Sequence, residues 1–209
     1  LPAVLAETLR DFNNVKVVQA DVMEVDLHQL IQDEFSGLDV LVCANLPYYI
    51  TSPVIMKLLE EKLPVESLTV MVQKEAAVRI CAASGTRACG AVSVAVQYYS
   101  QPQILFDVPR DCFFPAPNVD SAVIRLNIRK EPPVKLETEE KQFFKLVKAA
   151  FGQRRKTVLN SLNTGLGKSK EELSAALQQA GIEPTARAEQ LTMEQFGTLC
   201  NLLFPNKAK

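Results

Sequence analysis

The sequence predicts an α/β fold with a mostly parallel sheet, followed by a smaller helical domain. Short apolar and β-branched runs alternate with helical patterns as far as residue 128, which is the order of elements typical of parallel α/β domains. After Arg129 the pair Pro132-Pro133 interrupts the chain, and helical periodicity follows with few strand signals. We therefore expect an α/β domain over residues 1–130 and a helical domain over residues 131–209.

Strands and helices alternate in the first of these domains. The expected helices are roughly 1–9, 52–62 and 74–83, and the expected strands are 15–19, 38–44, 68–72, 104–108 and 122–128. The run over 38–44 is largely apolar, as in strands buried within a parallel sheet. In the helix over 52–62, we expect Ser52 to be the N-cap and Pro53 to occupy the first helical position.

The second domain is expected to be helical throughout. Its predicted helices are 139–151, 155–163, 169–180 and 192–203. Gly181 is expected to end the third of these, because glycine readily adopts the left-handed conformation at a helix C-terminus. Thr192 is expected to cap the fourth, with Gln195 at the position that completes a capping box.

The composition indicates a globular protein with a substantial core, since 47% of its residues are hydrophobic and 22% are charged. No apolar run approaches the roughly 18 residues that a membrane span needs. The start of the chain shows neither a secretory signal nor an initiator methionine, and the missing methionine suggests a trimmed chain. Nothing in the sequence demands more than a monomer.

Cysteine and histidine usage excludes several kinds of site. The five cysteines are widely scattered and contain no CxxC pair, so neither a disulfide framework nor a zinc site is predicted. We expect reduced, mostly structural thiols in a cytoplasmic protein. His28 is the only histidine and is expected at the surface, so neither a histidine-based triad nor a histidine metal cluster can form.

Charge is distributed unevenly along the chain. Residues 1–128 carry nine Lys and Arg against 15 Asp and Glu, whereas residues 129–209 carry 14 against nine. Such a difference in sign between two halves suggests that the C-terminal part meets a polyanion.

A tetrapeptide of suggestive chemistry, Asn45-Leu46-Pro47-Tyr48, follows the expected strand over 38–44. In open α/β sheets, ligands bind beyond the carboxyl ends of the strands. The amide of Asn45 and the carbonyl of Leu46 can both accept hydrogen bonds from an exocyclic amine. Pro47 stiffens the turn, and Tyr48 offers a flat face to a purine. The motif favours methyl displacement from a sulfonium to an amine, which needs placement more than a strong base. A plain strand-terminating turn is the alternative.

Two further segments fit the same chemistry. In Gln19-Ala20-Asp21-Val22, Asp21 could accept a hydrogen bond from an adenine amino group, with Val22 in apolar contact with the ring. The alternative for Asp21 is a helix or turn cap. The segment from Cys112 to Ser121 is rich in proline and contains Phe113. It could form a second stacking surface that clamps an extruded base opposite Tyr48, or it could simply pack into the core.

Together, the segments QADV, NLPYYI, QKEAAVRI, AVSVAVQYY, FFPAPNVDSAVIRL and FGQRRKTVLNSL resemble the small-subunit ribosomal RNA adenine dimethyltransferases over nearly the whole chain. That resemblance implies a Rossmann-like class I methyltransferase sheet with a small C-terminal helical domain. It also implies a role in ribosome biogenesis, in which S-adenosylmethionine is used to dimethylate N6 of two adjacent adenines in small-subunit ribosomal RNA (rRNA) of the pre-30S particle. Neither a metal nor a membrane is implied.

The resemblance assigns roles to individual residues. Asp21 and Val22 are expected to contact the adenine of the cofactor, and Asn45 to lie between the methionine end of the cofactor and the target amine. The carbonyl of Leu46 is expected to accept a hydrogen bond from that amine. Tyr48 and Phe113 are expected to sandwich the target base.

A basic run over 141–156 is the expected RNA-binding region, because it holds six basic and no acidic residues. Lys141, Lys145 and Lys148 recur at helical spacing on one face, whereas Phe144, Val147 and Phe151 mark an apolar face. Arg154, Arg155 and Lys156 follow as a compact phosphate-binding cluster. A solvated helix face is the alternative.

The sequence departs from the family pattern at its start. Family members carry a glycine-rich cofactor loop after their first strand and an acidic residue at the end of the second, and these eight glycines nowhere form GxGxG. The chain opens inside the helix that should follow the second strand, and the absent strands should lie between 15–19 and 38–44. We therefore expect the 209-residue polypeptide alone to bind the cofactor poorly and to be inactive.

Three other functions compete with this interpretation. Methyltransferases that modify a large-subunit rRNA adenine and confer antibiotic resistance share the Asn-Leu-Pro-Tyr type of turn, but the Pro-Ala-Pro-Asn-Val-Asp-Ser segment favours the small-subunit enzymes. DNA adenine methyltransferases usually have Pro at the second position of the turn, where Leu46 stands. A non-catalytic ribosome assembly factor would use the basic helical region alone and would have little need of both Asn45 and Tyr48.

Overall fold

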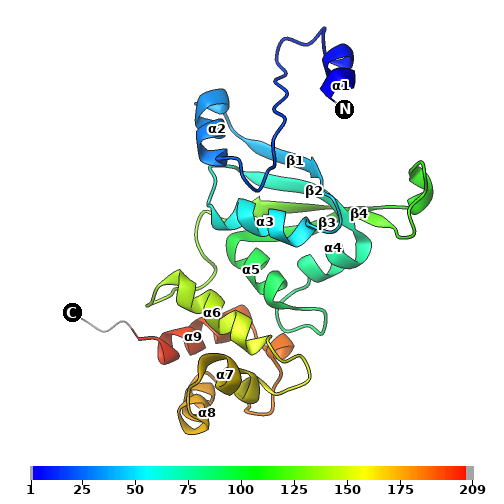
Figure 1. Cartoon of the computed structure of the whole chain (residues 1–209). Coiled ribbons are helices and arrows are strands. Elements are labelled where there is room, and N and C mark those ends of the chain that lie inside the picture. Colours follow the sequence, from blue (N-terminus) through cyan, green and yellow to red (C-terminus); the bar gives the residue numbers. More distant parts are fainter. Residues whose placement is uncertain (1, 206–209) are drawn as a thin grey trace. The chain divides into compact units, whose positions relative to one another are not determined.

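The computed structural model describes residues 2–205, and the chain divides after Leu38 into two compact units. The first unit contains α1 (Pro2–Thr8) and α2 (Leu27–Phe35), shown in blue in Figure 1. The helix expected over 1–9 is confirmed apart from its ends, and Leu1 lies outside the described residues. Asp26 caps α2 by accepting a hydrogen bond from the amide of Gln29 at 3.0 Å.

The strand expected over 15–19 does not form. A strand exists only where its backbone groups pair with those of a neighbour. The four-stranded sheet found among residues 2–205 does not include this segment. Its valines, Val15, Val17 and Val18, are exposed. The β-branched residues therefore predicted a local conformation for which the described chain offers no partner.

The second unit is built on a sheet with the strand order β1-β2-β4-β3 (Figure 1). The strands are β1 (Leu41–Asn45), β2 (Ser67–Gln73), β3 (Ser100–Val108) and β4 (Ser121–Ile128). β1 and β2 are parallel, whereas β4 is antiparallel to both β2 and β3. The prediction of a mostly parallel sheet is therefore wrong for the described residues. The segment over 109–120 joins β3 and β4 as neighbours in a hairpin, which makes this pair antiparallel.

The two central strands form the floor of the core. In β2, Leu68, Val70 and Val72 are fully buried, and in β4 the same is true of Ala122, Ile124 and Leu126. The helices that follow the strands are α3 (Thr51–Glu60), α4 (Lys74–Ile80) and α5 (Ala91–Tyr99). α4 packs against β2, β3 and β4, and α5 packs against α3, α4 and β3. By contrast, the expected burial of the strand over 38–44 is only partial, since β1 lies at the sheet edge with Leu41 exposed.

Several helix boundaries differ from the predictions, and the helix expected over 155–163 spans Val158–Leu166. α3 begins at Thr51 after Ile50, and Ser52 is not its cap. Pro53 is thus the third helical residue, a position that tolerates proline because amides of the first turn have no partner within the helix. α4 ends at Ile80 rather than at Ala83.

A helix absent from the prediction, α5, forms although its valines and tyrosines have strand propensity. Tertiary contacts stabilise it: Ser93 donates from its hydroxyl to the carbonyl of Arg79 at 2.6 Å, and its own Oγ accepts from the amide of Gly90 at 2.9 Å. Val94 and Val96 are fully buried.

The C-terminal region is helical, as expected. It contains α6 (Glu140–Ala150), α7 (Val158–Leu166), α8 (Lys170–Gln179) and α9 (Met193–Leu203), besides the short 3₁₀ helix η2 (Ala188–Gln190). The capping box of Thr192 and Gln195 is confirmed. Gly181, at a φ of 66°, follows α8 as predicted, and the next amide, of Ile182, donates back to Leu177. The aromatic rings of Tyr98, Phe143 and Phe144 join this region to α5.

No helix within residues 2–205 is both long enough and apolar enough to cross a membrane. The domain boundary near residue 130 stays a prediction: the last strand ends at Ile128 and the next helix begins at Glu140.

Candidate active site

Asn45 and Leu46 stand at the carboxyl end of β1. Asn45 is the last residue of the strand and is exposed. The next amide, of Leu46, donates to the carbonyl of Met71 in β2 at 3.3 Å, and its side chain is buried. The hydrogen bond fixes the amide of Leu46, and burial fixes its side chain. Its carbonyl oxygen accepts none of the hydrogen bonds found among residues 2–205. A fixed main-chain acceptor thus lies beside an exposed amide side chain.

Pro47 closes the turn that leads into α3. Its carbonyl accepts from the amide of Ile50 at 3.1 Å and from the hydroxyl of Thr51 at 3.3 Å. Thr51 is buried, so the turn is tied to the interior rather than free in solvent. These bonds fit the alternative of a plain strand-terminating turn, and the carbonyl of Leu46, unpaired within the described part of the chain, fits either interpretation.

Tyr48 connects this turn to a second segment that is distant in the sequence. Its hydroxyl and that of Ser121 share a hydrogen bond of 2.6 Å. Ser121 is fully buried, begins β4, and pairs with Gln73 at the carboxyl end of β2. The next residue, Tyr49, is 85% exposed. The aromatic ring of Tyr48 is therefore held by the sheet.

The segment over 109–120 arises from the same end of the sheet. It contains the 3₁₀ helix η1 (Arg110–Cys112), and Phe113 follows it half-buried. Phe114 projects fully into solvent. The structure thus brings Asn45, Leu46, Pro47 and Tyr48 together with the root of the segment that carries Phe113.

Lys74 and two aspartates anchor this segment. The amide of Lys74 donates to the carbonyl of Asp120 at 3.0 Å, and its ammonium donates to Asp107 at 2.6 Å. The hydrogen bond to Asp107 raises the pKa of Lys74. Asp120 also accepts from the amide of Arg110 at 3.0 Å. The sequence does not single out these residues, although Lys74 and Asp120 lie within the segments QKEAAVRI and FFPAPNVDSAVIRL that resemble the family.

Asp21 and Val22 belong to the first unit, which is described by itself. Asp21 is exposed, and its carboxylate accepts from the amide of Met23 at 2.8 Å. Its carbonyl accepts from the amides of Glu24 and Val25. The turn-capping alternative is thus observed for Asp21, and the contact of Asp21 and Val22 with a cofactor stays a prediction.

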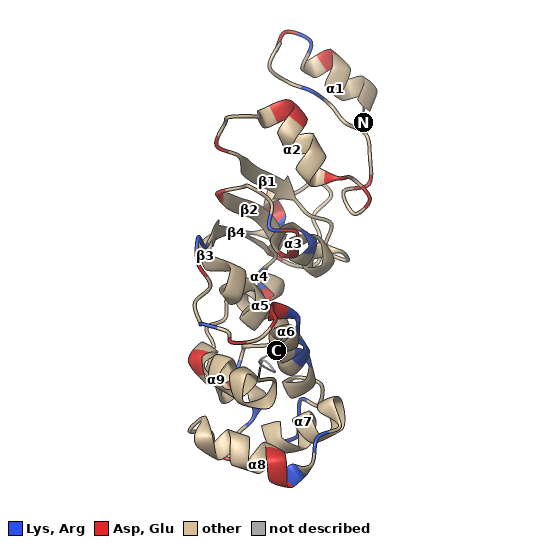
Figure 2. Cartoon of the chain, turned by 90° about the vertical axis from the view of Figure 1, so that its left-hand side faces the viewer, with Lys and Arg blue, Asp and Glu red and all other residues tan. Residues whose placement is uncertain are grey.

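The basic face expected on α6 is present. Lys141, Lys145 and Lys148 are exposed, whereas Val147 is buried and Phe144 is half-buried. Figure 2 shows basic positions along α6. Lys141 forms an ion pair with Glu139, so its charge is partly offset.

A basic groove continues from this helix. It measures about 740 Å³ and lies between the turn after α6, the first turn of α5 and the segment around η2. The cations that line it are Arg79, Arg87, Arg154, Arg155, Lys156 and Arg187. Glu189 is the acidic residue in its lining. The predicted cluster over 154–156 is exposed and is joined here by three arginines that the sequence does not group with it.

No group of histidine, cysteine, aspartate and glutamate side chains in the described part of the chain could hold a metal ion.

Comparison with known proteins identifies the family. The ribosomal RNA adenine dimethylases match residues 1–204. The ribosomal RNA small subunit methyltransferase A of Alkaliphilus metalliredigens is 52% identical over 197 residues, which are 94% of this chain and 68% of that protein. The protein of the same name from Geobacillus sp. strain WCH70 is 48% identical over 204 residues, which are 96% of this chain and 70% of that protein.

Solved structures agree on the fold. A dimethyladenosine transferase from Plasmodium falciparum has a TM-score of 0.72 at 24% identity, covering 94% of this chain and 75% of that chain. The 23S rRNA methyltransferase ErmE has a TM-score of 0.68 at 26% identity, covering 96% and 77%. The fold is therefore that of Rossmann-like methyltransferases, with a mixed sheet and C-terminal helices. With its turn of Asn45 to Tyr48 at the carboxyl end of β1, the chain belongs to the ribosomal RNA adenine dimethylase family.

Proposed function

We propose that this chain holds the target adenine in an S-adenosylmethionine-dependent reaction that dimethylates N6 of two adjacent adenines in small-subunit rRNA. One observation carries the proposal: the carbonyl of Leu46 is fixed and unengaged beside the exposed amide of Asn45. Two acceptors side by side at the end of a strand suit an –NH2 group. The relatives that are about half identical to this chain are named as small-subunit enzymes.

The chemistry follows from orientation. In the first transfer, Asn45 and the Leu46 carbonyl each accept one N–H of the adenine amine, which turns the nitrogen lone pair out of conjugation with the ring and towards the methyl donor. In the second transfer, the single remaining N–H donates to one of these two acceptors. S-adenosylmethionine, when bound, would supply an electrophilic methyl group, and its S–CH3 bond would break to release the neutral thioether S-adenosylhomocysteine. No strong base is required before transfer, because the nitrogen sheds its proton to water around exposed Asn45 only after it has gained the methyl group. Placement therefore accounts for most of the rate.

The residues available to hold the cofactor fit its chemistry. The amide of Asn45 can accept from the amine of the methionine portion, and the exposed carboxylate of Asp21 can accept from the adenine amino group, with Val22 beside the ring. Each of these contacts is part of the proposal.

Two aromatic residues hold the base. Tyr48 is aligned by Ser121, and Phe113 lies on a segment anchored by Lys74 and Asp120. An adenine that leaves its stack would regain stacking energy between two such rings. Because both rings are attached to the carboxyl end of the sheet, the clamp would form where Asn45 presents its amide.

Two basic surfaces bind the rRNA. The exposed face of α6 supplies Lys141, Lys145 and Lys148, and the turn after it supplies Arg154, Arg155 and Lys156. Such clusters bind phosphates largely without regard to sequence, which suits a folded rRNA in the pre-30S particle.

The five thiols are free, and burial raises the pKa of Cys81 and Cys200 to about 11. Free thiols at all five cysteines support a reducing compartment such as the cytoplasm as the place where the chain works.

Substitution of Asn45 tests the proposal. Asn45→Ala should lower methylation of undermethylated small subunits by about 100-fold, because one positioning contact is lost, while binding to the same subunits stays unchanged. Methylation is measured with this chain and with the chain joined to the N-terminal segment of the Alkaliphilus metalliredigens relative. Full activity of the Asn45 variant would contradict the proposal. Binding without methylation by the unsubstituted joined chain would favour the assembly-factor function instead.

Substrate choice separates the second candidate function. The similarity to the 23S rRNA methyltransferase ErmE, at 26% identity, keeps a large-subunit substrate as the alternative. Small-subunit and large-subunit rRNA are offered to the same preparation, and methyl incorporation into each is counted. Incorporation into the large-subunit RNA alone would exclude the proposed substrate.

A further inference from the structure

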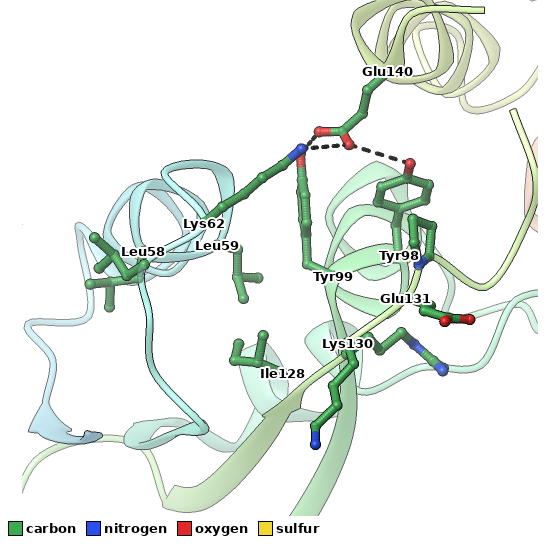
Figure 3. Close-up of a pocket in the computed structure, with 12 residues that line it drawn as sticks. Leu58, Leu59, Lys62, Tyr98, Tyr99, Ile128, Lys130, Glu131 and Glu140 are labelled. Carbon is green, nitrogen blue, oxygen red and sulfur yellow. Dashed lines mark hydrogen bonds and ion pairs between the residues drawn. The ribbon is translucent and has the colours of Figure 1, made fainter. Parts of the chain in front are cut away.

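A pocket of about 360 Å³ is lined in part by Ile128, the last residue of β4, and is drawn in Figure 3. β4 starts beside the site at Ser121 and ends beside the pocket at Ile128. The apolar floor of the pocket includes Leu58 and Leu59 of α3, and its rim carries Glu140, the first residue of α6. The pocket therefore lies where the helical region meets the sheet.

Three donors converge on the carboxylate of Glu140, and all come from the sheet side. Lys62 donates to it at 2.9 Å, Tyr99 at 2.7 Å and Tyr98 at 3.4 Å. Figure 3 shows the three side chains pointing to Glu140 from α5 and from the end of α3. Burial opposes ionisation of Glu140, but the bonds from Tyr99 and Lys62 outweigh it and lower its pKa. Glu140 is thus an ionised carboxylate that is bound by one cation, Lys62, and by two neutral hydroxyl groups, those of Tyr98 and Tyr99.

The same two tyrosines also hold the aromatic residues that follow on α6. The ring of Tyr99 stacks on Phe144 at a centroid distance of 5.3 Å, and the ring of Tyr98 lies 5.0 Å from Phe143. Glu140, Phe143 and Phe144 are three and four residues apart, so they share one helix face.

The lysines of α6 lie on a different face of the helix, which is exposed. Lys145 and Lys148 are exposed, and their direction depends on how α6 is rotated about its axis. A ring contact alone permits some rotation, whereas a carboxylate held by three donors has a defined direction. The buried residues Phe143, Leu146 and Val147 already set which face of α6 is packed. The Glu140 contacts further restrict the rotation of the helix that carries the basic face.

We propose that Glu140 is a positioning residue for rRNA: with Lys62, Tyr98 and Tyr99, it orients α6 so that its lysines meet rRNA phosphates together. The proposal rests on the proposed role of α6 in RNA binding. It assigns a role in RNA binding to an acidic residue, which would by charge alone repel RNA.

The negative charge of Glu140 makes the test decisive, because electrostatics and positioning predict opposite effects of its removal on RNA affinity. Removal of any acidic residue makes the chain more positive, so electrostatics alone predicts tighter RNA binding. Glu139 is a matched control, because it is the neighbouring glutamate and its one ion pair is with exposed Lys141 of the same helix. The variants Glu140→Ala and Glu139→Ala therefore change the net charge equally, and only the first disrupts the contact with α3 and α5.

The measurement is the Kd for small-subunit rRNA between about 50 and 200 mM salt. Glu140→Ala should weaken binding by about threefold or more and should reduce the slope of log Kd against log salt by about one, because one fewer phosphate is neutralised. Glu139→Ala should leave the slope unchanged and the affinity equal or higher. A loss of stability alone would lower the fraction of active protein but would not change the slope.

Two further variants complete the design. Tyr99→Phe keeps the stacked ring and removes the hydroxyl, so it should reproduce part of the Glu140 effect even if Glu140→Ala does not fold. Lys145→Ala tests the basic face itself. If Lys145→Ala changes neither affinity nor slope, the proposed RNA-binding role of α6 is wrong. If it changes both while the Glu140 and Tyr99 variants behave like Glu139→Ala, only the positioning role of Glu140 is wrong.

Discussion

The hydroxyl groups of Tyr48 and Ser121 lie 2.6 Å apart, which joins the turn after β1 to the first residue of β4. Ser121 is fully buried and pairs with Gln73 in β2. The position of the Tyr48 ring therefore depends on the antiparallel pairing of two strands rather than on its own turn alone. The anchor and the aromatic face can be separated by substitution.

Ser121→Ala removes the anchor but keeps the aromatic ring of Tyr48. A net loss of about 1 kcal/mol in positioning predicts a roughly fivefold lower methylation rate, whereas Tyr48→Ala, which removes the stacking face, should lower the rate further. Both rates are measured as methylation of undermethylated small subunits by the chain joined to the N-terminal segment of the Alkaliphilus metalliredigens relative. Tyr48→Phe is the control, because it removes the other hydroxyl group of the same hydrogen bond. Its methylation rate should match that of Ser121→Ala. Unchanged rates in both conservative variants would show that the bond does not align the ring.

The basic groove predicts a dependence on salt. Lys156→Ala removes a cation from its lining, so the slope of log Kd against log salt for small-subunit rRNA should fall by about one. Lys170 is an exposed lysine on α8 outside the groove, and Lys170→Ala should leave that slope unchanged. Equal slopes for the two variants would mean that the groove does not bind the phosphates.

Local chemistry made part of the fold predictable. The capping box of Thr192 and Gln195 and the turn after α8 at Gly181 involve residues close in sequence, and both were confirmed. α5 escaped prediction because valine and tyrosine favour strands, and its helical state depends on contacts such as that of Ser93 with Arg79. The segment over 15–19 failed for the converse reason, since strand propensity cannot supply a partner strand.

The same division applies to the candidate site. The residue types of Asn45 and Tyr48 suggested a chemistry because their functional groups can be read directly from the sequence. Ser121, which follows Tyr48 by 73 positions, could not be paired with it in advance, because the contact arises from the register of β4 on β2. The groove arginines Arg79 and Arg187 are brought together in the same way.

Gly165 predicts a packing effect on stability. Alanine within a helix is ordinarily more stable than glycine by about 1 kcal/mol, but a Cβ at Gly165 would stand 2.6 Å from the Cβ of Ala149 in α6. Overpacking of this kind typically costs about 1–3 kcal/mol, so Gly165→Ala should lower the free energy of unfolding in urea. The compensating pair Gly165→Ala with Ala149→Gly should recover most of the loss. A stabilised single variant would show that α6 and α7 can move apart freely.

The cluster around Glu140 predicts the dependence of stability on pH. Its folded pKa lies below the ordinary 4.5, because the bonds from Tyr99 and Lys62 outweigh the burial that opposes ionisation. This stabilisation is present above the unfolded pKa and is lost as pH falls through the folded value. At alkaline pH, burial first and then Glu140 raise the pKa of Tyr98 from 10.0 to about 12. The contribution of protonated Tyr98 to the free energy of unfolding is therefore lost as the pH rises from about 10 to about 12. Thermal unfolding of the chain and of Glu140→Gln is compared between about pH 3 and pH 8. The difference in Tm should be constant near neutrality and should shrink below about pH 4.5. A difference that persists undiminished to the lowest pH would show that ionised Glu140 does not stabilise the fold.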